Sequence, residues 1–202
     1  MIPTIITADR TGRNMTDLFS ADFLANRRIF LSEEITSANA AEIILQLEYL
    51  DSRSNADILF YINCPGGSVT AGLSILDAMN RCKSPIVTVC TGIGASMAAI
   101  LVCCGQKGKR FITPMAEMMI HQPLAGISGQ ASDVERTANH VIKIKEKLNR
   151  ILSEHTGKDI QTISADSDRD YYLNAKEAIE YGLVDHFWRE GSFSSLSSRQ
   201  KA

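Results

Sequence analysis

Apolar residues recur along the chain with two different spacings that alternate. Short continuous apolar runs, typical of strands buried on both faces, are separated by segments in which apolar residues recur every three or four positions, as on one face of a helix. For example, Ile43, Leu47 and Leu50 share one face of a helix that begins at residue 36 or 37. The pattern predicts strands at residues 28–31, 57–63, 86–91, 110–113 and 117–120, and helices from residue 36 or 37 to about 50 and at residues 70–82, 96–104, 132–154 and 175–181.

The alternation of strands and helices between residues 28 and 120 is typical of an α/β fold built from stacked β-α-β units. A length of 202 residues suits one domain, which we place at residues 21–191. Residues 1–20 are mostly polar and lack periodicity, so we expect a loop or flexible arm there. The serine-rich residues 192–202 predict a flexible tail.

One predicted helix is long for a domain of this size. It starts with a capping box from Ser132 to Glu135 and ends before Gly157, which gives a length of about 35 Å at 1.5 Å per residue. A glycine-containing extended stretch, residues 124–129, precedes it. We expect this helix to project from the body and to pack against something else.

Charge and cysteine content narrow the function classes. The chain has 21 basic and 23 acidic residues, a balance that argues against a nucleic-acid partner. It contains neither the apolar core of a signal peptide nor an apolar run of the length that a membrane helix needs, so we expect a cytoplasmic protein. Five cysteines, none in a Cys-x-x-Cys pair, predict buried thiols in a reducing compartment and no metal site.

Ser96 is the strongest candidate for a nucleophile. It follows a buried strand and Gly94-Ala95 and opens an apolar helix, in a segment similar to the nucleophile elbow Gly-x-Ser-x-Gly with Ala98 in place of the second glycine. Free backbone N–H groups at a helix start favour a developing oxyanion. The alternative is that Ser96 is an ordinary helix N-cap.

A serine nucleophile needs a base, and His121 is the best placed of the four histidines. It ends an apolar strand, and the carboxyl ends of strands carry the sites of α/β proteins. A buried structural histidine is the alternative. The third member, an acid that orients the histidine, is Asp166, Asp168 or Asp170, and spacing does not choose among them or exclude a solvated acidic loop.

Gly66 and Gly67 follow another strand, and a glycine pair allows a substrate carbonyl to approach the backbone closely. The N–H groups of Gly67 and Met97 would then form an oxyanion hole. A simple turn is the alternative, whereas a phosphate-binding loop is disfavoured because no Gly-Lys-Ser/Thr sequence follows.

Taken together, these segments resemble the ClpP family, the proteolytic subunits of the Clp protease, over about residues 2–188. The resemblance implies a crotonase-like β-α-β superhelix and a serine peptidase with the triad Ser96, His121 and Asp170. It implies no metal or organic cofactor, because ATP would be consumed by a partner. The matching segments are residues 61–72 (YINCPGGSVTAG), 94–99 (GASMAA), 108–111 (GKRF), 119–123 (MIHQP), 129–131 (GQA), 168–170 (DRD) and 180–185 (EYGLVD).

The resemblance also implies an assembly of two stacked seven-membered rings, homomeric or shared with a paralogue. Residues 124–157, which we call the handle, would join the rings, and residues 1–20 would form axial loops. Unfolded polypeptide would bind as an added strand along Leu124, Ala125 and Gly126. The family's ring contact corresponds to Arg169, with Gln130 and Asp133 as partners across the equator.

The family's docking pocket for an AAA+ unfoldase, such as ClpX, ClpA or ClpC, is altered in this chain. Arg81 stands at a usually aromatic position, so we expect weak docking on this subunit's own ring unless the arginine turns away to solvent. The pocket corresponds to Leu59, Tyr61, Arg81, Val89, Thr91 and Thr113.

The sequence therefore predicts a serine endopeptidase subunit of a barrel-shaped, ATP-dependent protease that degrades unfolded proteins to short peptides. One alternative is a poorly active structural subunit that requires a typical paralogue in a mixed barrel, which the docking positions and Ala125 motivate. Another is a crotonase-like acyl-CoA enzyme, which shares the fold and the paired N–H groups.

Overall fold

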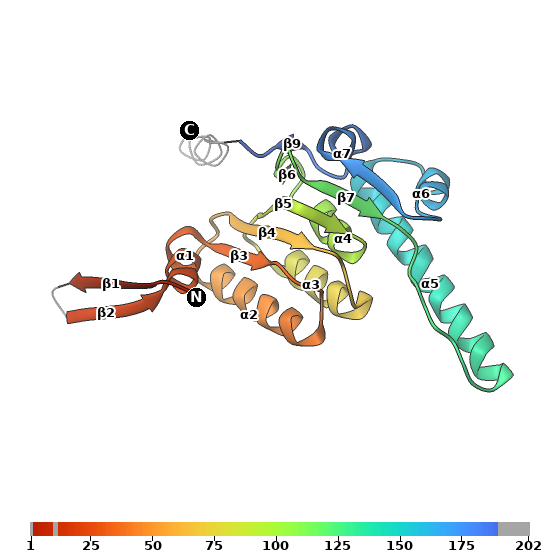
Figure 1. Cartoon of the computed structure of the whole chain (residues 1–202), viewed down its shortest axis with the longest axis horizontal. Coiled ribbons are helices and arrows are strands. Elements are labelled where there is room, and N and C mark those ends of the chain that lie inside the picture. The colour runs from red at the N-terminus through yellow and green to blue at the C-terminus, as the bar shows by residue number, and fades with distance from the viewer. Residues whose placement is uncertain (1, 10–11, 190–202) are drawn as a thin grey trace.

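A computed structural model of the chain describes residues 2–9 and 12–189, and it contains one main sheet of seven strands (Figure 1). The order β3-β4-β5-β6-β9 is parallel throughout, while β7 pairs in parallel with β5 and antiparallel with β8. The predicted α/β class is confirmed. The strands are β3 (Arg28–Leu31), β4 (Ile58–Cys64), β5 (Ile86–Ala95), β6 (Arg110–Ile112), β7 (Glu117–Ile120), β8 (Tyr171–Asn174) and β9 (His186–Phe187).

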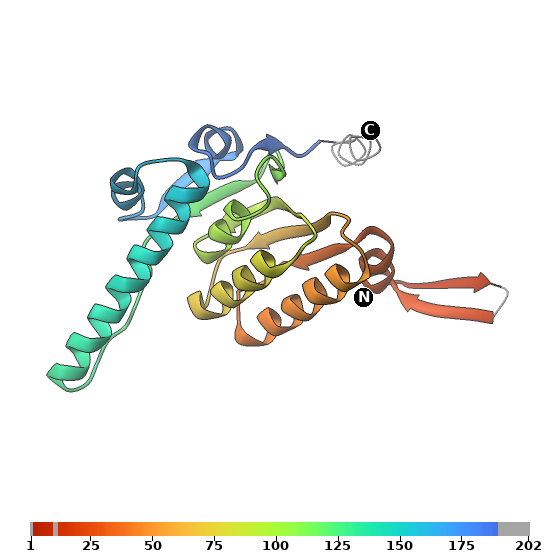
Figure 2. The same ribbon diagram turned by 180° about the vertical axis from the view of Figure 1, so that it is seen from behind.

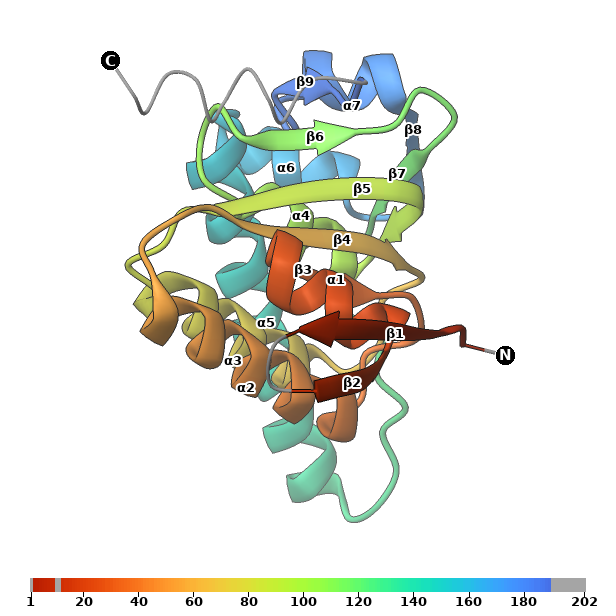
Figure 3. The same cartoon turned by 90° about the vertical axis from the view of Figure 1, so that its left-hand side faces the viewer.

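Three helices connect consecutive parallel strands, which produces the stacked β-α-β units (Figure 3). These are α2 (Ser37–Arg53), α3 (Val69–Arg81) and α4 (Met97–Cys103). Their apolar faces enclose the main core with alternate residues of β4, among them the fully buried Phe60. The other face of the sheet carries a smaller cluster of Leu59, Val87, Val89 and Phe111, against which Tyr61 and Trp188 pack.

Strand β5 is longer than its apolar run suggests. We expected the strand to end at residue 91, but it continues to Ala95, so the predicted end was wrong. Asn63 Oδ1 accepts the N–H of Ile93 at 3.1 Å where the pairing register with β4 shifts. This irregularity lets the first half of β5 pair with β6 and the second half with β7. Strand β5 thus ends immediately before Ser96.

Helix α5 (Ala131–Thr156) projects from the body, as expected (Figures 1 and 2). Its predicted capping box was wrong, because Gln130 is the N-cap, forms no side-chain cap, and leaves Ser132 within the first turn. Gly157 ends the helix at φ 77°, a left-handed conformation that favours glycine. Before the helix, residues 124–128 follow an open course beside it and pair with no strand in the described part of the chain, and residues 129–130 form a bend (Figure 1).

Two short helices complete the carboxyl-terminal part of the described chain. Helix α6 (Ile160–Asp166) was not predicted, and helix α7 (Ala175–Tyr181) was. A capping box between Asn174 and Glu177 begins α7. Among the described residues, no helix is long and apolar enough to cross a membrane.

The amino-terminal arm is more ordered than its polar sequence indicates. Strands β1 (Thr4–Asp9) and β2 (Gly12–Asp17) pair antiparallel, and α1 (Leu18–Asn26) follows. The expected loop was wrong because a two-stranded hairpin satisfies its own backbone and needs no buried apolar face. The hairpin projects from the body on the side away from α5 (Figure 1). The predicted tail, residues 192–202, lies outside the described residues.

Candidate active site

Ser96 lies at the junction of β5 and α4 in a strained backbone conformation. Its φ of 56° and ψ of −123° are unusual for a residue with a side chain, and such strain concentrates at functional sites. Its N–H donates to the carbonyl of Met119 on β7 at 2.8 Å. Although Ser96 occupies the N-cap position of α4, its hydroxyl forms no capping hydrogen bond and is therefore available for other contacts.

The imidazole of His121 links Ser96 to Asp170. Its Nε2 lies 2.8 Å from Ser96 Oγ, and its Nδ1 lies 2.9 Å from Asp170 Oδ1. With a proton on Nδ1, the ring donates to Asp170 and accepts the hydroxyl hydrogen of Ser96. His121 is 14% exposed and Asp170 57% exposed, so the site faces solvent on the Asp170 side.

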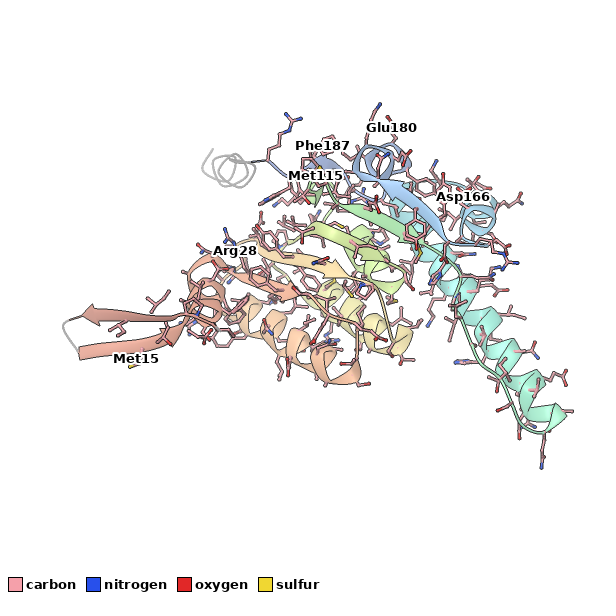
Figure 4. All side chains as sticks on the ribbon, viewed as in Figure 1. Met15, Arg28, Met115, Asp166, Glu180 and Phe187 are labelled. Carbon is pink, nitrogen blue, oxygen red and sulfur yellow. The ribbon has the colours of Figure 1, made fainter. Side chains whose placement is uncertain are left out.

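The three carboxylates that the sequence left open have separate partners. Asp166 accepts the hydroxyl of Tyr181 at 2.8 Å, and burial together with this hydrogen bond raises the pKa of the tyrosine. Asp168 accepts the side-chain amide of Gln122. Only Asp170, of the three, contacts His121. Figure 4 labels Asp166 at the end of α6, beside the part of α5 that joins the body.

The Gly66-Gly67 turn lies directly against Ser96. A Cβ on Gly66 would be 2.7 Å from Ser96 Cβ, and φ values of 105° and 136° make glycine the residue that fits both positions. Ile35 holds the turn, since its N–H donates to Gly66 O at 2.7 Å and its carbonyl accepts from Ser68 at 2.9 Å. The N–H groups of Gly67 and Met97 have no acceptor within the described residues, so both are free to receive one.

Cys64 also supports the site, although the sequence did not reveal this role. Its sulfur accepts the N–H of Gly66 at 3.3 Å and lies 3.4 Å from the carbonyl of the same residue. The side chain is fully buried, and this burial raises the pKa of the thiol. Cys64 thus supports the glycine turn from inside the protein as a neutral thiol.

A pocket of about 410 Å³ adjoins the triad on its Asp170 side. Its lining is His121, Gln122, Leu124, Asp168, Arg169 and Asp170. In the part of the chain that the structure describes, no group of three or more His, Cys, Asp or Glu side chains is arranged to hold a metal ion. The groups that converge at the site are the Ser96 hydroxyl, the His121 imidazole and the backbone N–H groups of Gly67 and Met97.

The family model for the Clp protease matches residues 10–190. The chain belongs to the Clp protease family. It is accordingly a peptidase of the ClpP type, and the expected family resemblance is confirmed.

In this Clp protease family member, five of the six expected docking residues lie on or beside the sheet face opposite the main core. Leu59 and Val89 are buried there beneath Tyr61, whose ring stacks on Phe30 at a centroid distance of 5.3 Å. Thr91 and Thr113 are half-buried at β5 and just after β6. Arg81 lies apart from them at the end of α3, on the helical side of the sheet, and pairs with Glu48 at 2.8 Å.

The expected ring contacts lie at two separate places. The side chain of Arg169 is 93% exposed beside Asp168, whereas Gln130 and Asp133 stand at the far end of α5. A single chain therefore does not bring them together. Leu124, Ala125 and Gly126 are exposed in the extended stretch that leads to α5.

Two further residues near the triad had no signal that we recognised in the sequence. Gln122 follows His121, and Lys145 lies on α5 with its ammonium 3.0 Å from Gln122 Oε1. The position of Gln122 beside the candidate base was the available clue. Lys145 has no spacing relation to the motif and is found only through the fold.

Proposed function

We propose that this protein is a serine endopeptidase that cleaves unfolded polypeptides to short peptides. The observation that carries the proposal is the bridging imidazole of His121, with Ser96 Oγ 2.8 Å from one ring nitrogen and Asp170 2.9 Å from the other. This is the arrangement that activates a serine hydroxyl. Membership of the Clp protease family supports the same reaction class.

The reaction proceeds through an acyl-enzyme. Ser96 Oγ attacks the peptide carbonyl carbon while His121 Nε2 takes its proton, and Asp170 stabilises the resulting imidazolium. The C–N bond then breaks, and the departing amine receives that proton. Water, deprotonated by His121, attacks the ester, and Ser96 leaves with the proton restored. The N–H groups of Gly67 and Met97 receive the oxyanion in both halves, each donor contributing about 10²–10³ in rate.

Substrate binds as an extended strand along Leu124, Ala125 and Gly126. Their stretch is extended and exposed, and it has no strand partner among the described residues, so its backbone groups are available to a peptide. An unfolded chain can pair with this stretch whatever its sequence, because the pairing groups are backbone N–H and C=O groups. The methyl group of Ala125 leaves the substrate peptide less room along this stretch than a glycine would.

The active particle is two stacked heptameric rings in the cytoplasm, fed by an AAA+ unfoldase. Exposed apolar side chains on the handle, Leu124 at 83% and Ile142 at 53%, are suited to burial against another copy. Arg169 with Gln130 and Asp133 form the contact between rings, and residues 1–20 line the axial entrance. Unfoldase docking on this ring is weak, because Thr91 and Thr113 place hydroxyl groups beside the apolar Leu59, Tyr61 and Val89. Arg81 lies apart from these residues and pairs with Glu48.

The test is labelling by a fluorophosphonate probe together with turnover of a short fluorogenic peptide, with particle mass measured on the same samples. Ser96→Ala abolishes both activities and leaves the mass unchanged. Ser52→Ala, which removes an exposed hydroxyl on α2, leaves all three unchanged. Undiminished labelling of Ser96→Ala contradicts the assignment. A full-size wild-type particle that neither labels nor turns over peptide alone, but does so with a paralogue, supports the structural-subunit alternative.

A further inference from the structure

A polar network joins three segments of the chain behind the triad. Lys145 Nζ donates to Gln122 Oε1 at 3.0 Å and lies 3.9 Å from Asp168 Oδ1. Gln122 Nε2 in turn donates to the carbonyl of Asp168 at 2.9 Å and lies 3.4 Å from Asp168 Oδ1. The network therefore closes on itself, and its members come from α5, the end of β7 and the loop between α6 and β8.

The network lies next to the contact between His121 and Asp170. The antiparallel β7–β8 ladder ends with Ile120 opposite Tyr171, so His121 and Asp170 are the first residues beyond it. On the other side, the N–H of Gln122 donates to the carbonyl of Ser167 at 2.7 Å. The triad contact is thus held between the ladder and the Gln122 hydrogen bonds, and both sides determine its length.

Lys145 is the point at which α5 fastens this arrangement. The side chain is 28% exposed, which makes the charge interaction stronger than that of a fully solvated pair. Within the described structure, residues 131–144 form no side-chain hydrogen bond or ion pair with the body. Arg169 also faces Asp168, with its Nε 3.9 Å from Asp168 Oδ2, but its side chain is 93% exposed. Without Lys145, Gln122 Oε1 loses its donor.

We infer that Lys145 and Gln122 are positioning residues that hold Asp170 at His121 for the proposed peptidase reaction. Neither contacts the reacting atoms. Loss of the ammonium lets Gln122 rotate and the Asp168–Asp170 segment move away from the histidine. A displacement of about 1 Å at a catalytic group lowers rate substantially, in the worst cases about 10²-fold.

The experiment uses the full chain in its assembled form and compares Lys145→Met with Lys145→Arg. Lys147→Met is the matched control, because Lys147 is exposed on the same helix and has no partner in the described structure. For Lys145→Met we expect kcat for a short peptide to fall about tenfold, with KM changed less than about twofold. The rate of fluorophosphonate inactivation falls in parallel, particle mass is unchanged, and Lys145→Arg restores both rates.

A double-mutant cycle separates positioning from general destabilisation. Because Lys145 acts through Gln122, Lys145→Met combined with Gln122→Met slows the enzyme no more than the stronger single variant. The inference is overturned if the rate losses of the two single variants multiply in the double variant, or if kcat is unchanged in Lys145→Met. It is also overturned if dissociation of the particle explains the loss, or if Lys145→Arg fails to restore the rate. Failure of the proposed function is distinct, since the wild-type protein itself would then neither label nor turn over peptide.

Discussion

Two pairs, each of a basic side chain and a carboxylate, lie at opposite ends of the same sheet and differ in burial. Arg110, where β6 begins, is 5% exposed and pairs with Asp185, 14% exposed, at 2.7 Å. It also donates to the carbonyls of Cys103 and His155. His121 and Asp170, just past the carboxyl end of β7, meet at 2.9 Å with the carboxylate 57% exposed.

The two pairs also differ in whether the hydrogen-bonding groups around them all have partners. Arg110 and Asp185 are enclosed by partners, since Asp185 Oδ2 also accepts the N–H groups of Gly108 and Arg110. Around Ser96 the backbone is strained, and the nearby N–H groups of Gly67 and Met97 lack acceptors within the described chain. A saturated pair stabilises the fold, whereas a pair beside free donors can receive a substrate. Variants that remove one partner from each pair separate these roles.

The largest effect is expected for Asp170→Asn. The amide presents an N–H to His121 Nδ1, which favours the ring tautomer with its proton on Nε2, and that nitrogen can no longer accept the proton of Ser96. We expect kcat/KM to fall about 10³–10⁴-fold, while the free energy of unfolding changes by less than about 0.5 kcal/mol. Peptide turnover and denaturant unfolding check this, with the exposed Asp77→Asn as the control. Retention of a tenth of the activity contradicts the role of Asp170.

Asp185→Asn is expected to have the reverse profile. It leaves the buried guanidinium of Arg110 without its counter-ion, and such a loss destabilises a protein by about 3–5 kcal/mol. The kcat of the remaining folded enzyme stays within about twofold, because Asp185 lies at the other end of the sheet from Ser96. A fall in kcat without a fall in the free energy of unfolding would contradict the structural role.

The loss of stability in Asp185→Asn is expected to depend on pH. Burial alone raises the pKa of Asp185, but hydrogen bonds from Arg110 outweigh it, and the pKa lies below its ordinary value. A lowered native-state pKa gives stability that is present above the unfolded-state pKa and is lost as pH falls through the native one. The stability difference between wild type and Asp185→Asn is therefore full at neutral pH and shrinks below about pH 4. A difference that grows on acidification contradicts this account.

The smallest effect is expected at a third pair, Arg81 with Glu48. Both side chains are more than half exposed, at 61% and 54%, so solvent screens their attraction. Arg81→Ala is expected to change the free energy of unfolding by less than about 1 kcal/mol and to leave peptide turnover unchanged. Denaturant titration with Glu48→Ala alongside checks this. A loss of stability as large as that of Asp185→Asn would show that burial does not determine how much each pair contributes to stability.

The β-α-β framework was predictable because its apolar spacing is regular. Strands β3 and β7 fall at their expected residues, and the helices lie within a few positions of their predicted bounds. The continuation of β5 to Ala95 was not predictable from the glycines alone, because a hydrogen bond from Ile93 to Asn63, distant in sequence, stabilises it. The hairpin β1–β2 was missed because residues 1–20 show no apolar periodicity, which was the signal that revealed the other strands.

The site was predictable where local sequence places a residue at a strand end, as with Ser96 and His121. Spacing alone did not choose among the three aspartates, and only the resemblance to the ClpP family pointed to Asp170. In the structure, Tyr181 and Gln122 engage the other two. Lys145 was out of reach of sequence reasoning, since its role depends on α5 crossing behind the end of β7.

The most direct measurement is the structure of the protein after reaction with a fluorophosphonate. The account predicts phosphorus bonded to Ser96 Oγ and a phosphonyl oxygen about 2.7–3.1 Å from the backbone nitrogens of Gly67 and Met97. It also predicts that the imidazole of His121 stays in contact with Asp170. An adduct on another residue, or an oxygen directed away from both nitrogens, would contradict the account.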